Sequence, residues 1–224
     1  MQDKSLYRTG SIGIESALST NKVLRNTYML LGMTLLFSSV TAGISMAMGL
    51  SQGMALILSL VGFGLIFVVN KTADSSNGLV AIFAFTGVMG AAIGPMLNYY
   101  LALPGGPALV MQALGGTALV FFGLSAYALT TRKDFSYMGG FLMVGLLVAV
   151  VAMIANIFLN IPALSLTISA AVVMIMSGLI LFDTSRIING GETNYIRATV
   201  SLYLNIYNLF IHLLRLLSLG GGDD

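Results

Sequence analysis

Seven long apolar runs divide the chain, separated by short stretches of Gly, Pro, Asn and charged residues. The runs cover residues 26–48, 54–70, 78–100, 108–130, 137–159, 163–184 and 195–217. A run of about 20 apolar residues can cross a bilayer as an α-helix, and continuous rather than alternating hydrophobicity argues against a membrane β-barrel. The pattern therefore predicts an all-α integral membrane protein with a seven-helix membrane domain (26–217), preceded by a tail (1–25) and followed by a shorter one (218–224).

Composition agrees with this class and excludes several others. Of the 224 residues 57% are hydrophobic and 8% are charged, whereas a soluble domain has about 25% charged residues. The net charge of +2 is too small to indicate nucleic-acid binding. With no cysteine and one histidine, disulfides and multi-histidine or thiolate metal sites are excluded. The first 20 residues lack the apolar core of a signal peptide, so the first run is expected to remain as a membrane anchor.

Basic residues gather on one side of the predicted bundle. The connections 49–53, 101–107 and 160–162 contain no charged residue. Nine of the ten Lys and Arg residues fall on the opposite side: Lys4, Arg8, Lys22, Arg25, Lys71, Arg132, Lys133, Arg186 and Arg197. Arg215 alone is near the other face. Because Lys and Arg favour cytoplasmic loops, the N-terminus is predicted to be cytoplasmic and the C-terminus to lie outside.

Small residues within the runs predict close packing of helices. The third run contains Gly87, Gly90 and Gly94, and the last two form a G-x-x-x-G pattern that lets helix backbones approach. The fourth and fifth runs contain further glycines at 115, 116, 123, 139, 140 and 145. Pro95 should kink the third helix, and Asn98, within a turn of it, is a candidate to satisfy a backbone group that the proline frees.

A polar stripe runs along the last apolar segment, "SLYLNIYNLFIHLLR" at 201–215. It consists of Ser201, Asn205, Asn208, His212 and Arg215, with Asn194 and Arg197 on the same line upstream. Spacings of four, three, four and three place the first five within an arc of about 80°. Polar groups facing lipid cost free energy, so the stripe should face protein or water. Two alternatives remain: hydrogen bonds to neighbouring helices, or the lining of a hydrated path. In both cases the last helix is expected to be central.

Asp183 is an acidic residue in "LILFDTSRI", at the end of the sixth run that is predicted to be cytoplasmic. A carboxylate near a helix C-terminus meets the negative end of the helix dipole, so it needs a partner or a function. Arg186, three residues on, could pair with it on the same helix. The other interpretation is a proton- or cation-sensing carboxylate that faces the bundle interior, because charges at membrane depth often mark pathways.

Catalytic patterns are weak. The stretch "GLSAY" at 123–127 approaches the G-x-S-x-G nucleophile pattern but ends in Tyr127. Ser125 and His212 are expected near opposite ends of the bundle, so a catalytic dyad is not predicted. An aspartyl protease needs two paired carboxylates, and Asp183 is the one acid expected within the membrane. No phosphate-binding loop or dinucleotide fingerprint appears. We predict no enzyme, no catalytic residue, no cofactor and no firm metal site.

Longer strings, among them "GGTALVFFGLSAYALTTRKDFSYMGG" and "GLILFDTSRIINGGETNYIRATVSLYLNIYNLFIHLLRLL", resemble the Bax-inhibitor (TMBIM) family and, within it, the bacterial YccA branch. The resemblance covers nearly the whole chain and is most specific from about Gly115 onward. It implies a seven-helix bundle whose last helix is central and wrapped by the first six. That agrees with the position inferred from the polar stripe.

The resemblance implies two functions, of which one is a pH-sensitive calcium leak. In leak members two aspartates on the last two helices share a proton; Asp183 matches the first, but "LYLN" places Asn205 where the second is expected. Since an asparagine does not titrate, the two-carboxylate sensor is incomplete. Leak members also have an arginine latch near the end of the second helix, for which Lys71 is a candidate replacement. Asp183, Asn205, Arg186 and Lys71 thus form the candidate set for sensing H⁺ or a transient Ca²⁺ at Asp183.

The YccA branch implies the other function: a protein of the bacterial inner membrane that modulates the membrane AAA protease FtsH and is also its substrate. In that membrane, the orientation inferred from the basic residues gives a multi-pass protein with a periplasmic C-terminus. The implied partners are FtsH, its associates HflK and HflC, and the lipid bilayer. Such a role needs no catalytic group. Residues 1–20 have the polar composition of a flexible tail that an ATPase could grip. Protease modulation is our leading hypothesis, the leak is the alternative, and a structural membrane chaperone without an ion path is a third.

Overall fold

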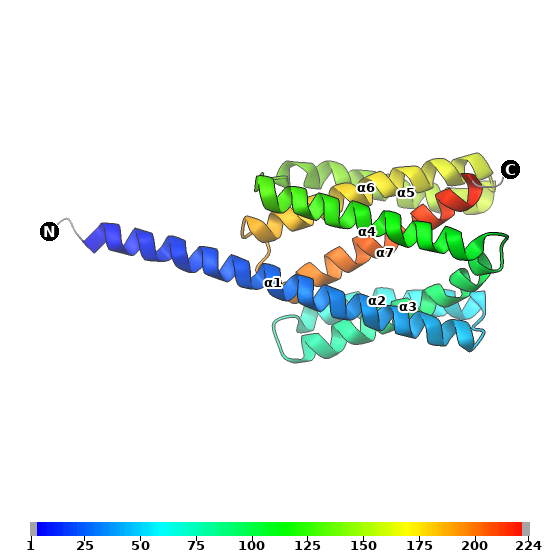
Figure 1. Cartoon of the computed structure of the whole chain (residues 1–224), viewed down its shortest axis with the longest axis horizontal. Helices are drawn as coiled ribbons and strands as arrows, with labels where there is room; N and C mark the ends of the chain where they lie inside the picture. Colours follow the sequence, from blue (N-terminus) through cyan, green and yellow to red (C-terminus); the bar gives the residue numbers. More distant parts are fainter. Residues whose placement is uncertain (1–3, 221–224) are drawn as a thin grey trace.

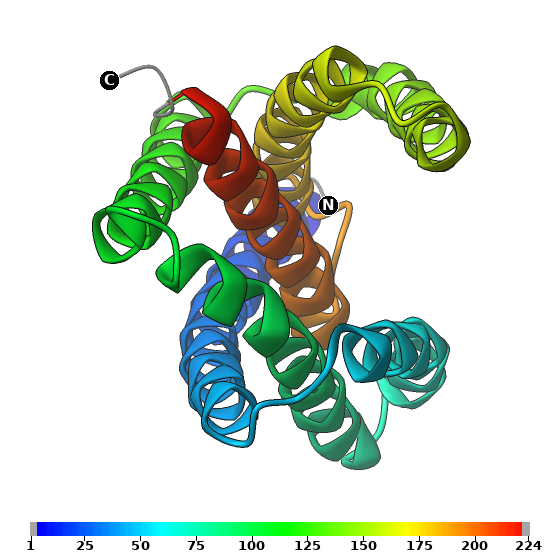
Figure 2. The ribbon, with the colours of Figure 1, turned by 90° about the vertical axis from the view of Figure 1, so that its right-hand side faces the viewer.

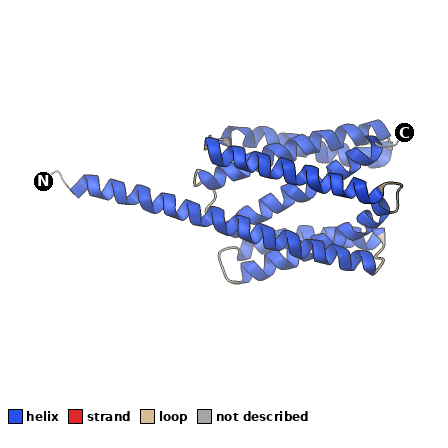
Figure 3. Cartoon of the chain, viewed as in Figure 1, coloured by secondary structure: helices blue, strands red, loops and turns tan. Residues whose placement is uncertain are grey.

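The structure is a computed structural model that describes the backbone of residues 4–220 and the side chains of residues 20 and 22–219. It contains α1 (Lys4–Ala47), α2 (Gln52–Thr72), α3 (Asn77–Leu101), α4 (Gly106–Thr131), the 3-10 turn η1 (Ser136–Met138), α5 (Gly139–Leu159), α6 (Pro162–Ile188) and α7 (Tyr195–Gly220). The described residues form helices and loops without strands (Figures 1 and 3). Seven helices are long and apolar enough to cross a membrane, which confirms the predicted all-α fold.

Helix ends follow the local sequence. Ser51 caps α2, where its hydroxyl accepts a hydrogen bond from the Met54 amide at 3.2 Å. Pro162 begins α6, a position where its missing N–H costs nothing. Arg132 and Asn160 end α4 and α5 in the left-handed conformation, at φ of 51° and 50°. The short loops that result bring consecutive helices back antiparallel, as the sequence predicts.

The helices form two groups of three that α7 bridges. Figure 1 shows α1, α2 and α3 on one side, α4, α5 and α6 on the other, and α7 crossing obliquely between them. Helix α7 contacts α1, α2, α3, α4 and α6, whereas α5 packs on α6 and η1 without reaching α7 (Figure 2). The central position of the last helix is therefore confirmed. The expectation that all six other helices wrap it is wrong for α5, because α6 stands between them.

Burial follows this arrangement. On α7 the side chains of Leu202, Tyr203, Leu209 and Leu214 are fully buried. On α5 the opposite holds: Phe141 is 78% exposed, which suits an outer helix whose apolar surface meets lipid acyl chains. Hydrophobic residues thus serve both the core and the membrane-facing surface, as the near-continuous apolar runs predict.

Gly90 and Gly94, in the G-x-x-x-G of α3, lie close against a neighbouring helix. A Cβ built on Gly90 would lie 2.2 Å from the Ser38 carbonyl oxygen of α1, and one built on Gly94 would lie 2.3 Å from the Ser45 hydroxyl oxygen. The predicted close packing is confirmed here. It is wrong for Gly115 and Gly123 on α4 and for Gly140 on α5, where a Cβ would meet no atom within 4 Å.

Pro95 lies inside α3, where it removes the hydrogen bond that the Ala91 carbonyl would otherwise accept. Ser45 on α1 donates to this carbonyl at 2.7 Å. Asn98 instead donates to the Met46 carbonyl near the end of α1, at 3.1 Å. The expectation that Asn98 compensates for the proline is thus wrong, because a hydroxyl on the neighbouring helix reaches the freed carbonyl first.

The first helix extends well beyond the predicted span. It begins at Lys4, so residues 4–25 of the predicted tail are helical and extend away from the other helices (Figure 1). This differs from the expected flexible segment. No proline interrupts these residues, and a helix already nucleated in the membrane lengthens at little cost. Residues 1–3 and 221–224, which belong to the two predicted tails, lie outside the described residues.

Candidate functional site at the junction of α6 and α7

Asp183 and Asn205 meet where α6 and α7 pack together. Asn205 is 5% exposed, and its side-chain amide donates to Oδ2 of Asp183 at 2.7 Å. Arg186 turns away: its guanidinium donates to the Gly191 carbonyl at 3.2 Å and lies 3.9 Å from the carboxylate of Glu192. Among the described side chains, Asp183 forms no ion pair with Arg186. The carboxylate is therefore held by an amide from the central helix.

The rest of the α7 polar stripe has several different partners. His212 is 7% exposed and its Nδ1 lies 3.2 Å from the hydroxyl oxygen of Ser169 on α6. Asn208 donates to the Leu204 carbonyl of its own helix at 2.9 Å, and Ser201 is half-buried. The stripe thus makes direct hydrogen bonds to α6 at two depths, through Asn205 and His212. These bonds favour the first alternative, helix-to-helix attachment, and a hydrated path along the stripe stays a prediction.

Arg215 ends the stripe at the opposite side of the bundle from Asp183. Its side chain is exposed and lines a cavity of about 340 Å³. The cavity is also lined by Asn156 of α5, Asn160 of the loop that follows, and Ser165 of α6. Asn156 is already engaged, because it donates to the Ser165 hydroxyl at 2.6 Å. The stripe therefore passes from the buried α6 contacts to a polar surface at its end.

The beginning of α7 is tied to the loop between α2 and α3. The Asn194 side-chain oxygen accepts hydrogen bonds from the Ile196 and Arg197 amides at 2.9 and 3.1 Å, which caps the helix. Its amide group donates to the Ala73 carbonyl and to Asp74, at 3.0 and 2.8 Å. Arg197 forms an ion pair with the same Asp74. The loop carboxylate thus fixes where the central helix begins.

Lys71 does not take the place of a latch to Asp183. It is exposed in the last turn of α2, and the ion pairs of the described residues do not include it. The charge contact near this end of α2 comes from Asp74, which sequence reasoning did not single out. A lone aspartate in a polar loop, 123 positions from Arg197, carries no signal of its own.

Among the described residues, four buried hydroxyl groups lie at a similar helix depth to Asp183 and have no hydrogen-bond partner. They belong to Thr27 and Tyr28 on α1, Ser125 on α4 and Thr184 on α6. A buried hydroxyl without a partner costs free energy, so this level of the bundle is not optimised for stability alone. Ser125 does not pair with His212, whose hydrogen bond goes to Ser169, as their expected positions near opposite ends of the bundle predict.

The chemistry available at the junction is limited to one carboxylate and one amide. Calcium takes six to eight oxygen ligands, whereas Asp183 and Asn205 offer a few at most. Within the described residues no group of three or more His, Cys, Asp or Glu side chains lies close enough to hold a metal ion. The contact can therefore hold two helices together, and the described residues contain no cluster built to hold a metal ion.

Two tyrosines on another face of α7 were missed by the sequence analysis. The Tyr203 hydroxyl lies 2.7 Å from that of Ser38 on α1, and the Tyr207 hydroxyl donates to the Met89 carbonyl of α3 at 3.3 Å. They anchor α7 to the first helix group. A signal was present on α1, where Thr34, Ser38, Thr41 and Ser45 recur at spacings of four, three and four.

Comparison with known proteins shows the family to which this chain belongs. The family described as "Inhibitor of apoptosis-promoting Bax1" matches residues 20–222. The chain is 56% identical to a protein of Escherichia coli strain K12 named "Modulator of FtsH protease YccA", over 209 residues that cover 93% of this chain and 94% of that protein. A Vibrio cholerae protein named only as an uncharacterized membrane protein is 51% identical over the full length of both chains. This chain belongs to the Bax inhibitor family.

Proposed function

We propose that this chain is an inner-membrane protein that modulates the membrane protease FtsH. The observation that carries the proposal is 56% identity, across 93% of the chain, to an E. coli protein named as a modulator of that protease. A second E. coli protein with the same identity is named as an inner membrane protein. Modulation by binding requires no catalytic group.

The proposed orientation places the N-terminus in the cytoplasm and the C-terminus in the periplasm. Residues 4–21 of α1, which precede its apolar span and which we call the α1 extension, lie on the same side as the loops after α2, α4 and α6. We call this the charged side. Lys71, Arg132, Lys133 and Arg197 lie on or next to these loops. The loops on the opposite side contain no charged residue, and we call it the uncharged side. Among the described residues, Arg215 is the one basic residue near it. The positive-inside rule then supports a cytoplasmic charged side.

The α1 extension is the proposed point of attachment for the protease. It adds the 18 residues 4–21 before the first apolar span, which begins at Lys22. At 1.5 Å per residue this helix reaches about 27 Å from the span. An AAA protease needs an accessible segment outside the membrane to engage its substrate, and this segment would serve the chain both as modulator and as substrate. HflK and HflC are the proposed companions of FtsH in the complex.

A paired truncation tests this proposal. The full chain is expected to co-purify with FtsH from mildly solubilised membranes and to be degraded more slowly when FtsH is depleted. Removing residues 4–20 should abolish this turnover while the seven-helix bundle, judged by its helical circular dichroism and monodisperse elution, persists. Removing residues 221–224 at the other end is the control and should leave turnover unchanged. If loss of residues 4–20 leaves turnover intact, the attachment proposal is wrong, and failure of the full chain to co-purify would refute the modulator proposal itself.

A second candidate function, a weak pH-modulated cation leak, is favoured by one observation: the Asp183 carboxylate inside the helix contact, held by Asn205 at 2.7 Å. Purified protein in liposomes loaded with a calcium dye tests it. Asp183→Asn and Asn205→Asp should shift calcium flux in opposite pH-dependent ways, with Asn208→Asp as a control on the same helix. Flux no greater than that of empty liposomes between pH 5 and pH 8 would eliminate the leak.

A further inference from the structure

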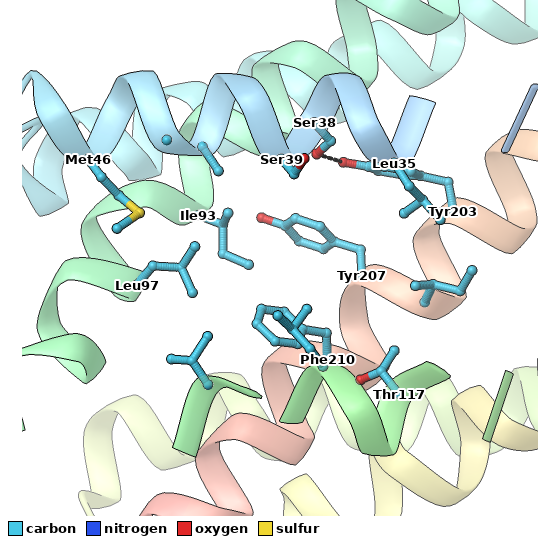
Figure 4. A pocket seen from close by; sticks show the side chains of 15 residues that line it. Leu35, Ser38, Ser39, Met46, Ile93, Leu97, Thr117, Tyr203, Tyr207 and Phe210 are labelled. Atoms are coloured by element: carbon cyan, nitrogen blue, oxygen red, sulfur yellow. Dashed lines mark hydrogen bonds between the residues drawn. The ribbon is translucent and has the colours of Figure 1, made fainter. Parts of the chain in front are cut away.

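An apolar cavity of about 280 Å³ lies between the two helix groups (Figure 4). Its walls come from four helices, α1, α3, α4 and α7. Leu35 and Met46 line it from α1, Ile93 and Leu97 from α3, and Phe210 from α7. Nearly all of the wall is carbon. The cavity is distinct from the junction of Asp183 and Asn205, because α6 contributes no residue to it.

The hydroxyl groups in the wall are all engaged with the protein itself. Ser38 and Tyr203 bond to each other at 2.7 Å (Figure 4). Ser39 and Thr117 each donate to a carbonyl of their own helix at 2.7 Å, and Tyr207 donates to the α3 backbone at 3.3 Å. A polar ligand would thus find no free donor there. The cavity is built for an apolar occupant and is unsuited to an ion path.

The cavity opens sideways, toward the membrane. Within the described residues α1 and α4 make no contact with each other, so the gap between them is its mouth. At the rim Ser39 and Gly43 of α1 are exposed, and Leu114 of α4 is 47% exposed. A Cβ built on Gly43 would meet no atom within 4 Å, which leaves the entrance clear.

The depth of the cavity matches one leaflet. Its α4 residues run from Val110 to Thr117, 4 to 11 positions from the start of α4 at Gly106, which is about 6–17 Å along the helix. Half of a bilayer's hydrocarbon core is about 15 Å thick. The cavity therefore extends from the uncharged side of the bundle to about its middle.

We propose that this cavity binds one acyl chain of a membrane lipid from the leaflet on the uncharged side. An apolar cavity of about 150 Å³ takes up a molecule the size of benzene, so a cavity of about 280 Å³ accommodates a longer stretch of hydrocarbon. Lipid is the medium at the mouth, and filling the cavity restores the dispersion contacts that an empty one would lack. The bound chain would occupy the gap between α1 and α4, whose described residues make no contact with each other.

Photolabelling in bilayers tests the proposal. The full chain is reconstituted into nanodiscs that contain a phosphatidylethanolamine with a diazirine in its acyl chain, then irradiated, digested and sequenced by mass spectrometry. Adducts are expected to concentrate at residues 35–46, 110–117 and 203–210. Gly43→Leu places a side chain in the mouth and should reduce these adducts at least fivefold, whereas Leu114→Ala widens the mouth and should increase them.

The matched control is Gly32→Leu, about three turns earlier on the same helix, exposed, and with no atom within 4 Å of its built Cβ. It should leave labelling in the cavity unchanged. The proposal is overturned if cavity adducts in the wild type are no more frequent than those on exposed Phe67 of α2, or if Gly43→Leu and Gly32→Leu label alike. Photocrosslinked dimers joined through this mouth would also overturn it, by identifying a second copy of the chain as the occupant.

Discussion

Gly90→Ala is the sharpest test of how the first helix group is held together. The added methyl group would lie 2.2 Å from the Ser38 carbonyl oxygen and 2.3 Å from the Thr41 hydroxyl oxygen. Ordinary contacts of a Cβ begin at about 3.4 Å. The backbones of α1 and α3 would therefore have to separate by about 1.2 Å at this point, because a carbonyl oxygen, unlike a side-chain end, cannot rotate away.

The cost follows from that separation. Overpacking a well-packed site costs about 1–3 kcal/mol, and the backbone clash places Gly90→Ala near the upper end. The gap would also lengthen the 2.7 Å bond from Ser45 to the Ala91 carbonyl, one turn further along. A loss of about 3 kcal/mol lowers the midpoint of thermal unfolding by roughly 6–12 °C for a chain of this size.

Thermal stability in detergent measures the effect, with helical circular dichroism or the fraction that elutes as a monodisperse peak after heating. The control is Gly32→Ala on α1, where the methyl group meets open space and the better helix propensity of alanine stabilises by up to about 1 kcal/mol. The two variants should thus shift the midpoint in opposite directions. Equal shifts would refute the conclusion that α1 and α3 are in backbone contact at Gly90.

Three further predictions concern single hydrogen-bonding groups. Asn205→Leu leaves Asp183 without its donor and should reduce stability by about 1.5–3 kcal/mol in the same thermal assay. Ser45→Ala leaves a buried α3 carbonyl without its donor and should cost about 1–3 kcal/mol. Hydrogen bonds from the Ser136 side chain and backbone hold the pKa of Asp134 below its usual 3.8, so Asp134→Ala should speed amide exchange in η1 at neutral pH and lose this effect as the pH falls through the lowered pKa.

The predictions for Asn205 and Ser45 each have a control variant on the same helix, and the prediction for Asp134 is controlled by its dependence on pH. Asn208→Leu removes a bond within α7, and Ser39→Ala removes one within α1, so both should change stability by less than about 1 kcal/mol. If either control costs as much as its partner variant, the interhelical bond is not the stabilising contact. If the effect of Asp134→Ala on exchange does not depend on pH, the carboxylate charge is not what orders the turn.

The architecture was largely predictable because lipid imposes strict rules on a sequence. A bilayer demands that every backbone group be paired within a helix, so seven apolar runs gave seven helices with ends near those expected. It was not predictable that α5 is largely exposed or that it makes no contact with α7. Apolar side chains suit lipid and helix neighbours equally, so hydrophobicity alone does not reveal which face of a spanning helix is buried. Gly115 and Gly90 look alike in sequence and differ entirely in surroundings.

The candidate site was predictable in part. The stripe on α7 correctly identified Asn205 and His212 as inward-facing, because polar groups cannot face lipid. Their partners were not predictable: Arg186 was in range of Asp183 along the helix, yet an amide from another helix took that place. Partners such as Asp74 for Arg197 depend on how two loops meet. Helix periodicity says nothing about that meeting.

The unbroken length of α1 has a mechanical consequence. With 44 residues it is about 66 Å long, and a continuous hydrogen-bonded helix carries tension along its axis. A pull on its free end would act directly on the contact with α3, where backbone oxygens of α1 lie over Gly90 and Gly94. A slide of one helical turn, about 5.4 Å, would move every one of those contacts out of register at once. The chain would then resist extraction from the membrane up to a threshold force. Beyond that force it would yield abruptly, with α1 leaving the bundle first.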